Sequence, residues 1–392
     1  MNNEIIEKTE FYFEYARSLR RDFHRHPELG FQETRTSGVI ARELGQLGLE
    51  VTTGIAKTGV VGLLEGEMPG PTILLRFDMD ALPVTEETGA DYASESAGVM
   101  HACGHDGHMA AGITIARILS ECRERMKGRV KFIFQPAEEG LGGAALMIQE
   151  GVLESPSPDY ALAFHLWNGR PVGWLGITSG PIMAGAEIFN IRITGQGGHG
   201  AIPDQTIDPI VVAAHLITVL QTITSRNVSP LQSAVLSVTC MQAGDTYNII
   251  PQQVELRGTI RVFEKSVREL VVGRMRQICA GIAQSFNCQI ELDVQGLTPP
   301  VVNDSRVTQA VEKATLKLYP TIGIDWQFRT MVSEDMAFFL ENIPGCYVMV
   351  GSANPEKGLC YGHHHPRFDF DEQALGYAVA IMTGAVFELM GI

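Results

Sequence analysis

Short apolar runs alternate with longer amphipathic segments from the N-terminus to about residue 180. Runs of strand length separated by stretches with helical periodicity are typical of an α/β sheet covered by helices. The predicted elements are, in order, helices over 4–24 and 33–47, strands over 60–64 and 72–76, a helix over 107–124, a strand over 130–135, a helix over 143–151 and a strand over 160–164.

The order of predicted elements changes near residue 180 and changes back near 300. The middle segment contains a strand over 187–194, a helix over 209–224, strands over 234–241 and 254–261, a helix over 266–285 and a strand over 289–294. This βαββαβ order is that of a ferredoxin-like unit. The first pattern then resumes, with helices over 305–318 and 334–342, a strand over 347–350 and a closing helix over 372–390.

The two patterns together predict an interrupted domain. We expect residues 1–182 and 299–392 to form one discontinuous α/β domain with a mixed sheet, and residues 183–298 to form a ferredoxin-like domain inserted into it. The strands of the first domain are followed by chemically active residues, and open α/β sheets carry their sites at the carboxyl ends of their strands.

The net charge and the cysteine content indicate which binding partners and which cellular compartment to expect. The net charge of −15 opposes attraction to nucleic acid or to an anionic membrane surface. The charged N-terminal segment lacks the apolar core of a secretory signal, and the apolar segments are too short to span a bilayer. The 7 cysteines are scattered without a disulfide framework. We therefore expect a cytoplasmic protein that binds neither nucleic acid nor membrane.

The histidines are clustered. Of the 11 histidines, the three outside the clusters are most simply structural: His24, His26 and His215. The densest cluster mixes imidazole, thiol and carboxylate side chains, separated by small residues, over His101, Cys103, His105, Asp106 and His108. Such a mixture can converge on one or two metal ions. A closed structural zinc site is disfavoured because the chain has no second paired-cysteine motif.

Carboxylates follow two of the predicted strands. Asp78 and Asp80 come after one strand, and Glu138 and Glu139 come after another. Adjacent glutamates are usually a solvated helix start, but directly after a buried strand they are more plausibly at the crevice of the sheet. Oxygen ligands and an ionisable neighbour beside nitrogen and sulfur ligands indicate a catalytic metal site.

Nine motifs in order along nearly the whole chain carry a family resemblance: RRDFHRHPELGFQE, RFDMDALPVTEE, HACGHDGHMA, FQPAEEGLGGA, ITGQGGHGAIPDQTIDPI, NIIP, GTIR, SEDM and HHHPRFDFDE. The chain thereby resembles the M20 metallopeptidases, specifically the amidohydrolase branch of hippurate and auxin-conjugate hydrolase type. The resemblance implies a dinuclear metal site whose ligands are Cys103, His105, Glu139, His165 and His364. It also implies that Glu138 is the general base and that Asp80 orients a metal-site residue.

The resemblance also assigns roles within the insert. It implies that the insert is a lid and dimerisation domain, and that His199 reaches the active site of a neighbouring subunit and holds the substrate carbonyl. Asn248 and Arg261 match residues that contact the free carboxylate of the substrate, for which a guanidinium is well suited. Without the resemblance, His199 would be an exposed turn residue, and Arg261 could instead form a structural ion pair. A homodimer is expected, with a tetramer as the larger alternative.

The activity implied is hydrolysis of the amide bond in an N-acyl amino acid or a peptide-like conjugate. Two divalent ions, drawn from zinc, manganese, cobalt and nickel, would activate a water molecule and polarise the carbonyl. The role of Cys103 as a bridging ligand stays open. Other hypotheses are a dipeptidase or carboxypeptidase of the same family, a thiol hydrolase with Cys103 as nucleophile, and a metal-binding protein without turnover.

Overall fold

A computed structural model describes residues 1–392 and divides the chain into two compact units. Unit 1 comprises Met1–Ile182, Val302–Arg329 and Asp335–Ile392, and unit 2 comprises Met183–Val301 and Thr330–Glu334. Each unit has its own hydrophobic core.

Unit 1 is built on an eight-stranded mixed sheet with the strand order β1-β2-β4-β3-β5-β16-β6-β15. Its strands are β1 (Glu50–Ile55), β2 (Gly59–Glu65), β3 (Met68–Asp78), β4 (Lys127–Gln135), β5 (Tyr160–Pro171), β6 (Trp174–Gly176), β15 (Gly323–Asp325) and β16 (Gly345–Ala353). β4, β3, β5 and β16 are parallel neighbours, so their carboxyl ends meet at one edge. The central parts of these strands are buried on both faces, in agreement with their apolar runs, such as 73–75 in β3 and 132–134 in β4.

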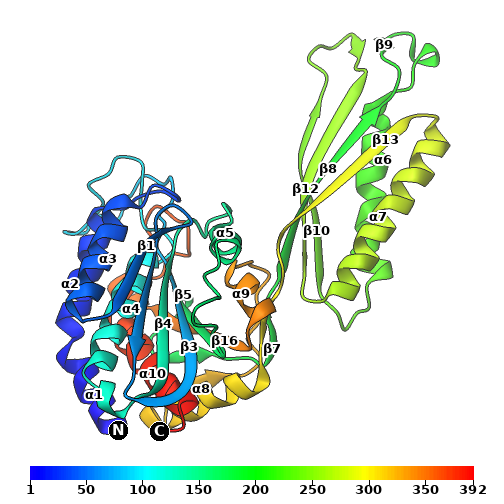
Figure 1. The fold of residues 1–392 in the computed structure, drawn as a ribbon. Coiled ribbons are helices and arrows are strands. Elements are labelled where there is room, and N and C mark those ends of the chain that lie inside the picture. The colour runs from blue at the N-terminus through cyan, green and yellow to red at the C-terminus, as the bar shows by residue number, and fades with distance from the viewer. The chain divides into compact units, whose positions relative to one another are not determined.

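Helices cover both faces of this sheet, which confirms the predicted α/β class. Figure 1 shows α2, α3 and α4 gathered on one side and α5 and α9 on the other. The helices are α1 (Asn2–Phe11), α2 (Phe13–Arg25), α3 (Thr34–Gln46), α4 (His105–Ser120), α5 (Gly143–Gln149), α8 (Ser305–Leu318), α9 (Met336–Asn342) and α10 (Gln373–Leu389), with short 3-10 turns η1 (Arg123–Arg125) and η4 (Pro355–Lys357). The chain leaves and re-enters unit 1 through β7 (Gly180–Met183) and β14 (Val301–Asn303), which pair with each other.

Helix α4 packs unusually closely on the sheet because of a glycine. A Cβ at Gly112 would lie 2.7 Å from the ring of Phe77, so only glycine allows this approach. Nearly every residue of α4 is buried, including its first residue, His105. The helix therefore fixes the residues at its N-terminus firmly within the core.

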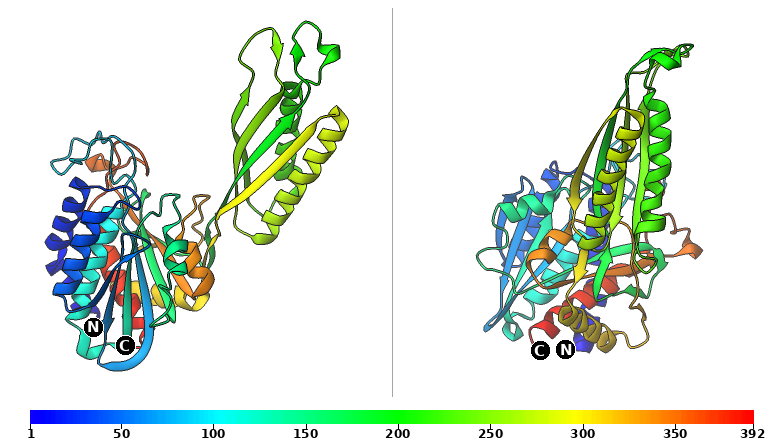
Figure 2. Two further views of the ribbon diagram at one scale, coloured as in Figure 1. Left: turned by 45° about the horizontal axis from the view of Figure 1, so that its top comes forward. Right: turned by 90° about the vertical axis from the view of Figure 1, so that its right-hand side faces the viewer.

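Unit 2 is a four-stranded antiparallel sheet, in the order β10-β12-β8-β13, with two helices on one side (Figure 2). Along the chain its elements are β8 (Gly185–Thr194), β9 (Gly198–His199), η2 (Pro203–Gln205), α6 (Pro209–Thr222), a π-helical turn η3 (Ile223–Asn227), β10 (Ala234–Ala243), β11 (Ile249–Ile250), β12 (Gln253–Val262), α7 (Lys265–Phe286) and β13 (Gln289–Thr298). β8 and β12 alternate buried and less buried side chains, as expected for a sheet with one covered face.

One stretch of helix, Pro209–Asn227, is long and apolar enough by composition to cross a membrane, with a mean hydropathy of 1.2. One face of it packs into the core of unit 2 through Val212, Leu216 and Leu220. Because an apolar core helix passes the same test, this single stretch is weak evidence for a membrane span.

Candidate metal centre

The side chains expected to bind metal come from separate elements that meet at one edge of the unit 1 sheet. Glu139 lies in the turn after β4, and His165 lies within β5. Cys103 immediately precedes the N-terminal turn of α4, and His105 is the first residue of that helix. His364 lies in the loop between β16 and α10, and its backbone N–H donates to the carbonyl of Ala102 at 2.7 Å, which ties that loop to the cysteine segment.

The potential ligand atoms converge. Cys103 Sγ lies 3.4 Å from His165 Nε2, and His364 Nε2 lies 3.3 Å from Glu139 Oε1. Two sets of three ligand atoms each lie within 4.8 Å of one another: Cys103 with Glu139 and His364, and His105 with Glu138 and Glu139. The structure thus brings together all the ligands that the sequence suggested, with Glu138 beside them.

Hydrogen bonds fix which nitrogen of two histidines is free for a metal. His105 Nδ1 donates to the backbone carbonyl of Asp80 at 2.9 Å, and its Nε2 has no hydrogen-bond partner. His165 Nδ1 donates to the carbonyl of Leu166 at 2.7 Å, so the lone pair of its Nε2 faces Cys103 Sγ. Metal-binding histidines typically donate their other ring N–H to a carbonyl or carboxylate in this way.

The other histidines of the dense cluster differ from the expected ligands, and His101 belongs to no set of converging ligand atoms. His108 Nδ1 lies 2.6 Å from Asp78 Oδ1, and its Nε2 accepts from the backbone N–H of Leu166 at 3.0 Å, so both ring nitrogens are occupied. His101 has no hydrogen-bond partner at either ring nitrogen. Burial lowers the pKa of His101 to about 3, which keeps it neutral.

Several buried polar atoms at this edge lack a hydrogen-bond partner, as expected of a site built for a cation. They are His105 Nε2, Glu139 Oε1 and Asp80 Oδ1. An unsatisfied buried polar atom costs on the order of 1–3 kcal/mol, so its presence calls for an explanation. Asp80 Oδ2 accepts from the backbone N–H of Glu139 at 3.0 Å, so Asp80 supports both Glu139 and His105. The nitrogen, sulfur and oxygen donors fit a divalent transition-metal ion.

The electrostatics of the protein alone also favour a cation here. Burial raises the pKa of the Cys103 thiol well above its ordinary value, and the charge of Glu139 raises it further. The nearby carboxylate of Glu139, whose Oε1 lies 3.3 Å from His364 Nε2, raises the pKa of His364. Burial lowers the pKa of His165. A bound divalent ion would offset the negative charge and stabilise the thiolate.

The backbone is strained at two points of the site. Ala137, just before the glutamate pair, has φ 56°, and His364 has φ 66°. A residue with a side chain in this left-handed region is uncommon, and such strain concentrates at functional sites. The two positive φ angles aim the glutamate pair and the loop histidine toward the same edge of the sheet.

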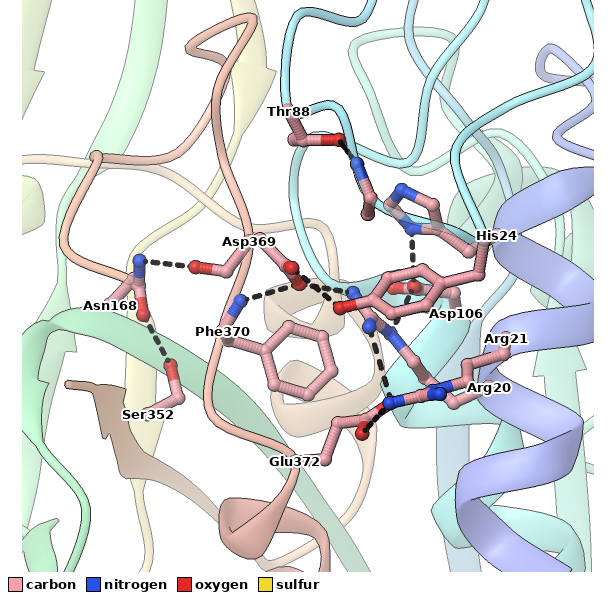
Figure 3. A network of polar contacts seen from close by, with 12 residues as sticks. Arg20, Arg21, His24, Thr88, Asp106, Asn168, Ser352, Asp369, Phe370 and Glu372 are labelled. Carbon is pink, nitrogen blue, oxygen red and sulfur yellow. Dashed lines mark hydrogen bonds and ion pairs between the residues drawn. The ribbon is translucent and has the colours of Figure 1, made fainter. Parts of the chain in front are cut away.

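Figure 3 shows a buried polar network centred on Arg20. Arg20 of α2 donates from Nε to Asp106 Oδ2 at 2.8 Å and from an Nη to Asp369 Oδ1 at 2.6 Å. Asp106 follows His105, and Asp369 lies on the loop that carries His364. The network therefore connects the two segments that present ligands. The sequence interpretation missed the roles of Arg20 and Asp369, although both lie within motifs that carry the family resemblance.

The residues of the insert lie in unit 2. His199 of β9 pairs in register with Ile249 of β11, which follows Asn248, and the side chain of His199 is exposed. The backbone N–H of Gly200 donates to the carbonyl of Asn248 at 2.8 Å, so His199 and Asn248 lie on one two-stranded ribbon. Arg261 of β12 donates from an Nη to the hydroxyl of Thr259 and, at 3.1 Å, to the carbonyl of Ile260, and burial lowers its pKa. The alternative of a structural ion pair for Arg261 therefore finds no support.

The sequence and the fold of this chain are similar to those of several known proteins. An N-acetylcysteine deacetylase of Bacillus subtilis is 42% identical over 363 residues, which cover 92% of this chain and 93% of that protein. The thermostable carboxypeptidase 1 of Saccharolobus solfataricus is 38% identical over 361 residues, covering 91% of each. A crystal structure from B. subtilis, described as a dinuclear metal binding peptidase from the M20 family, has a TM-score of 0.86 at 35% identity and covers 97% of this chain and 99% of that one. The profile of peptidase family M20/M25/M40 matches residues 74–388, and the chain belongs to that family.

Proposed function

We propose that this M20 enzyme hydrolyses the amide bond of small N-acyl amino acids, using two divalent ions held by unit 1. As a family member it is a metal-dependent hydrolase of amide bonds. The observation that carries the proposal is the convergence of nitrogen, sulfur and oxygen ligand atoms beside Glu138. The ligands would be Cys103, His105, Glu139, His165 and His364. Zinc, manganese, cobalt and nickel all suit such a mixed set.

Glu138 would act as the general base. Two divalent ions held by these ligands would lower the pKa of a water molecule and polarise the scissile carbonyl. Glu138 would take the proton of that water and return it to the leaving amine. Its carboxylate lies within 4.8 Å of the ligand atoms of His105 and Glu139, which is compatible with reach to a water between them. Asp80 would hold the ring of His105 and the backbone of Glu139 in place.

Unit 2 would supply the remaining contacts to the substrate. We propose that residues 183–298 form a ferredoxin-like lid and dimerisation domain, because the order β8, α6, β10, β12, α7, β13 and the sheet order suit that fold. Residues 1–182 and 299–392 would form the catalytic domain. His199 would hold the substrate carbonyl in the partner's site, and Asn248 and Arg261 would bind the free carboxylate. Within the chain the Arg261 guanidinium donates to a hydroxyl and a backbone carbonyl, which leave its charge available for that role.

The activity can be tested with one substrate panel. N-acetyl, N-benzoyl and indole-acyl amino acids would be compared with unmodified dipeptides, before and after chelation and after return of each metal. We expect hydrolysis of N-acyl amino acids, loss with the chelator and recovery with metal. Glu138→Gln should keep its metal but lose nearly all turnover, because the amide preserves the shape without accepting a proton. Substantial activity in Glu138→Gln would remove the general-base assignment.

The same panel separates the alternatives. A carboxypeptidase, the activity named for the S. solfataricus relative, would prefer the peptides. A thiol hydrolase using Cys103 would keep its activity after chelation. Burial raises the pKa of the Cys103 thiol, which opposes that reading because the nucleophile would have to be a thiolate.

Subunit exchange tests the proposed homodimer. Glu138→Gln and His199→Ala are each expected to be inactive. In a mixed dimer, one site would combine an intact Glu138 with an intact His199 from the other chain, and up to about half of the wild-type activity should return. If exchange is verified and no activity returns, His199 acts within its own subunit or not at all. The cytoplasmic location stays a prediction.

A further inference from the structure

A fourth histidine faces the candidate metal centre, and neither the ligand set nor the mechanism uses it. His363 precedes the expected ligand His364, and its Nδ1 lies 3.9 Å from Cys103 Sγ. The ligand atoms of Cys103, His165 and His363 also lie within 4.8 Å of one another. By proximity alone, His363 could be a metal ligand or a hydrogen-bond donor to the sulfur.

The hydrogen bond at the far side of the ring decides between these roles. The backbone N–H of Asn168 donates to His363 Nε2 at 3.3 Å. A backbone amide cannot give up its proton, so Nε2 must keep its lone pair. A neutral imidazole has one lone-pair nitrogen and one N–H, so the proton of His363 resides on Nδ1. The nitrogen that faces Cys103 is therefore a donor and has no lone pair to offer a metal.

The ring is held in this orientation. It lies against Trp167, with ring centroids 5.1 Å apart and planes tilted by 38°, and against Phe368, with centroids 5.0 Å apart and planes tilted by 36°. Turning the ring over would replace both nitrogens by carbons and lose both polar contacts. His363 is thus fixed by contacts with two aromatic rings and by one backbone donor.

The backbone donor is itself fixed. Asn168 Nδ2 donates to the carbonyls of Tyr361 at 2.7 Å and Asp369 at 2.9 Å, and Ser352 Oγ donates to Asn168 Oδ1 at 3.1 Å. Figure 3 shows Asn168 between Ser352 and the backbone of Asp369. The two ends of the loop that carries His363 are therefore tied to β5 through one asparagine.

The next two histidines, His364 and His365, differ from His363 in their ring contacts and in the partners of their ring nitrogens. His364 Nε2 points at the carboxylate of Glu139, and more than half of the His364 side chain is exposed. The ring of His365 is stacked on Tyr361 at 4.5 Å, and its Nδ1 accepts from the backbone N–H of Arg367 at 2.9 Å. Three consecutive histidines thus have three different environments.

We propose that His363 donates a hydrogen bond from Nδ1 to the sulfur of Cys103, and orients the thiolate for the metal ion without binding that ion. The inference rests on the proposed function, since it takes Cys103 as a metal ligand. His363 is then a positioning residue. Partners that orient a ligand in this way typically contribute 10–100-fold to metal affinity, so loss of the hydrogen bond should weaken binding by roughly tenfold.

Cobalt(II) provides a readout that packing alone would not change. A thiolate bound to cobalt(II) gives a sulfur-to-metal charge-transfer band, and a hydrogen bond to the sulfur lowers the energy of its lone pairs. In the cobalt-loaded full-length protein, His363→Leu should move this band to longer wavelength and weaken cobalt binding. His363→Asn should restore both values toward those of the wild type, because the amide nitrogen of asparagine can occupy the place of Nδ1. His363→Phe keeps an aromatic ring in contact with Trp167 and Phe368 and gives the same test if the leucine variant does not fold.

Two further variants serve as references. His365→Leu makes the same change two residues away and should leave the band and the affinity unchanged. His364→Leu removes an expected ligand and should lower the number of ions bound per subunit, measured by equilibrium dialysis. If His363→Leu also loses an ion, His363 is a ligand and the proposal is wrong. An unchanged band and affinity in folded His363→Leu, or no restoration by asparagine, would equally overturn it.

The outcomes also separate this inference from the proposed function. If the wild-type protein has no sulfur-to-cobalt band, Cys103 is not a ligand, and both the ligand set and the role of His363 fail. If the band is present and responds as expected but no substrate of the panel is hydrolysed, the proposed activity fails and the role of His363 stands.

Discussion

Replacing Arg20 with methionine should strongly destabilise unit 1. Arg20 is completely buried and forms close ion pairs with Asp106 and Asp369, whose side chains are 0% and 7% exposed. Methionine keeps an apolar stem of similar length but leaves the two carboxylates without their shared cation. Asp106 would retain only the contact of its Oδ2 with His24 Nδ1 at 2.7 Å, and its Oδ1 already lacks a hydrogen bond.

Removing one partner of a buried ion pair costs about 3–5 kcal/mol, because the remaining charge stays buried and uncompensated. We therefore expect Arg20→Met to lower the free energy of unfolding by about 4 kcal/mol. The neighbouring Arg21 provides a matched control. It is 30% exposed and pairs with Glu372 alone, so Arg21→Met should cost no more than about 1 kcal/mol.

Urea denaturation followed by tryptophan fluorescence would measure this difference in unit 1 specifically. The 3 tryptophans of the chain, Trp167, Trp174 and Trp326, all belong to unit 1. Metal-free protein should be used, because a bound ion adds its own stabilisation. If the two arginine variants unfold with free energies within about 1 kcal/mol of each other, the reasoning from burial is refuted.

Three further predictions concern single sites. Burial opposes protonation of His24, but Asp106 outweighs it and raises the pKa of His24; the stability lost in His24→Gln should therefore be full below about pH 6.5 and shrink as the pH rises through the raised pKa, and a loss independent of pH would contradict this. Cys103→Ala and His364→Ala should each lower metal content as well as activity, and full occupancy by metal analysis would exclude that residue as a ligand. Gly107→Ala should lower the melting temperature, because the new Cβ would lie 2.6 Å from a leucine side chain, whereas Gly38→Ala has no atom within 4 Å and should be neutral or slightly stabilising.

Most long elements could be predicted from the sequence because their hydrophobic patterns are strong. The closing helix was predicted over 372–390 and is observed as Gln373–Leu389, since it is apolar along nearly its whole length. The sequence pattern predicts one helix over 4–24, but the structure has two helices that meet at Tyr12. No proline or glycine lies at this turn of the backbone, so the sequence contains no residue that predicts it. A break of that kind depends on packing, and the local pattern carries no signal for it.

The strands that were not predicted from the sequence lack a long run of buried apolar residues. β1 (Glu50–Ile55) lies at the edge of the sheet and is largely exposed. β6 (Trp174–Gly176) and β15 (Gly323–Asp325) are three residues long. Such strands form because a neighbour offers free backbone groups, which is a property of the tertiary structure and not of the segment itself.

The candidate ligands were accessible to sequence reasoning because metal chemistry restricts residue types. Cysteine, histidine and glutamate residues are concentrated after predicted strands, and few functions other than metal binding explain that pattern. The structure brings these side chains together. The residue types alone do not say which histidines of a cluster bind, and only the family resemblance selects among them. His105 and His108 are three residues apart on one helix, and they differ in whether Nε2 is left without a partner or accepts from a backbone N–H. That difference depends on β5, which is far away in the sequence.

The supporting network was harder to predict, since Arg20 is 349 residues from Asp369. Nevertheless, helix α2 contained a usable signal. Its buried positions follow helical spacing along one face: Ala16, Leu19, Arg20, Phe23 and His24. Arg20 and His24 therefore share the face of three apolar residues, whereas Arg21 is about 100° further round the helix and partly exposed. A charge on the core face of an amphipathic helix must be paired to be tolerated. The pattern thus predicts that Arg20 has a buried acidic partner, even though the sequence alone does not identify Asp106 or Asp369.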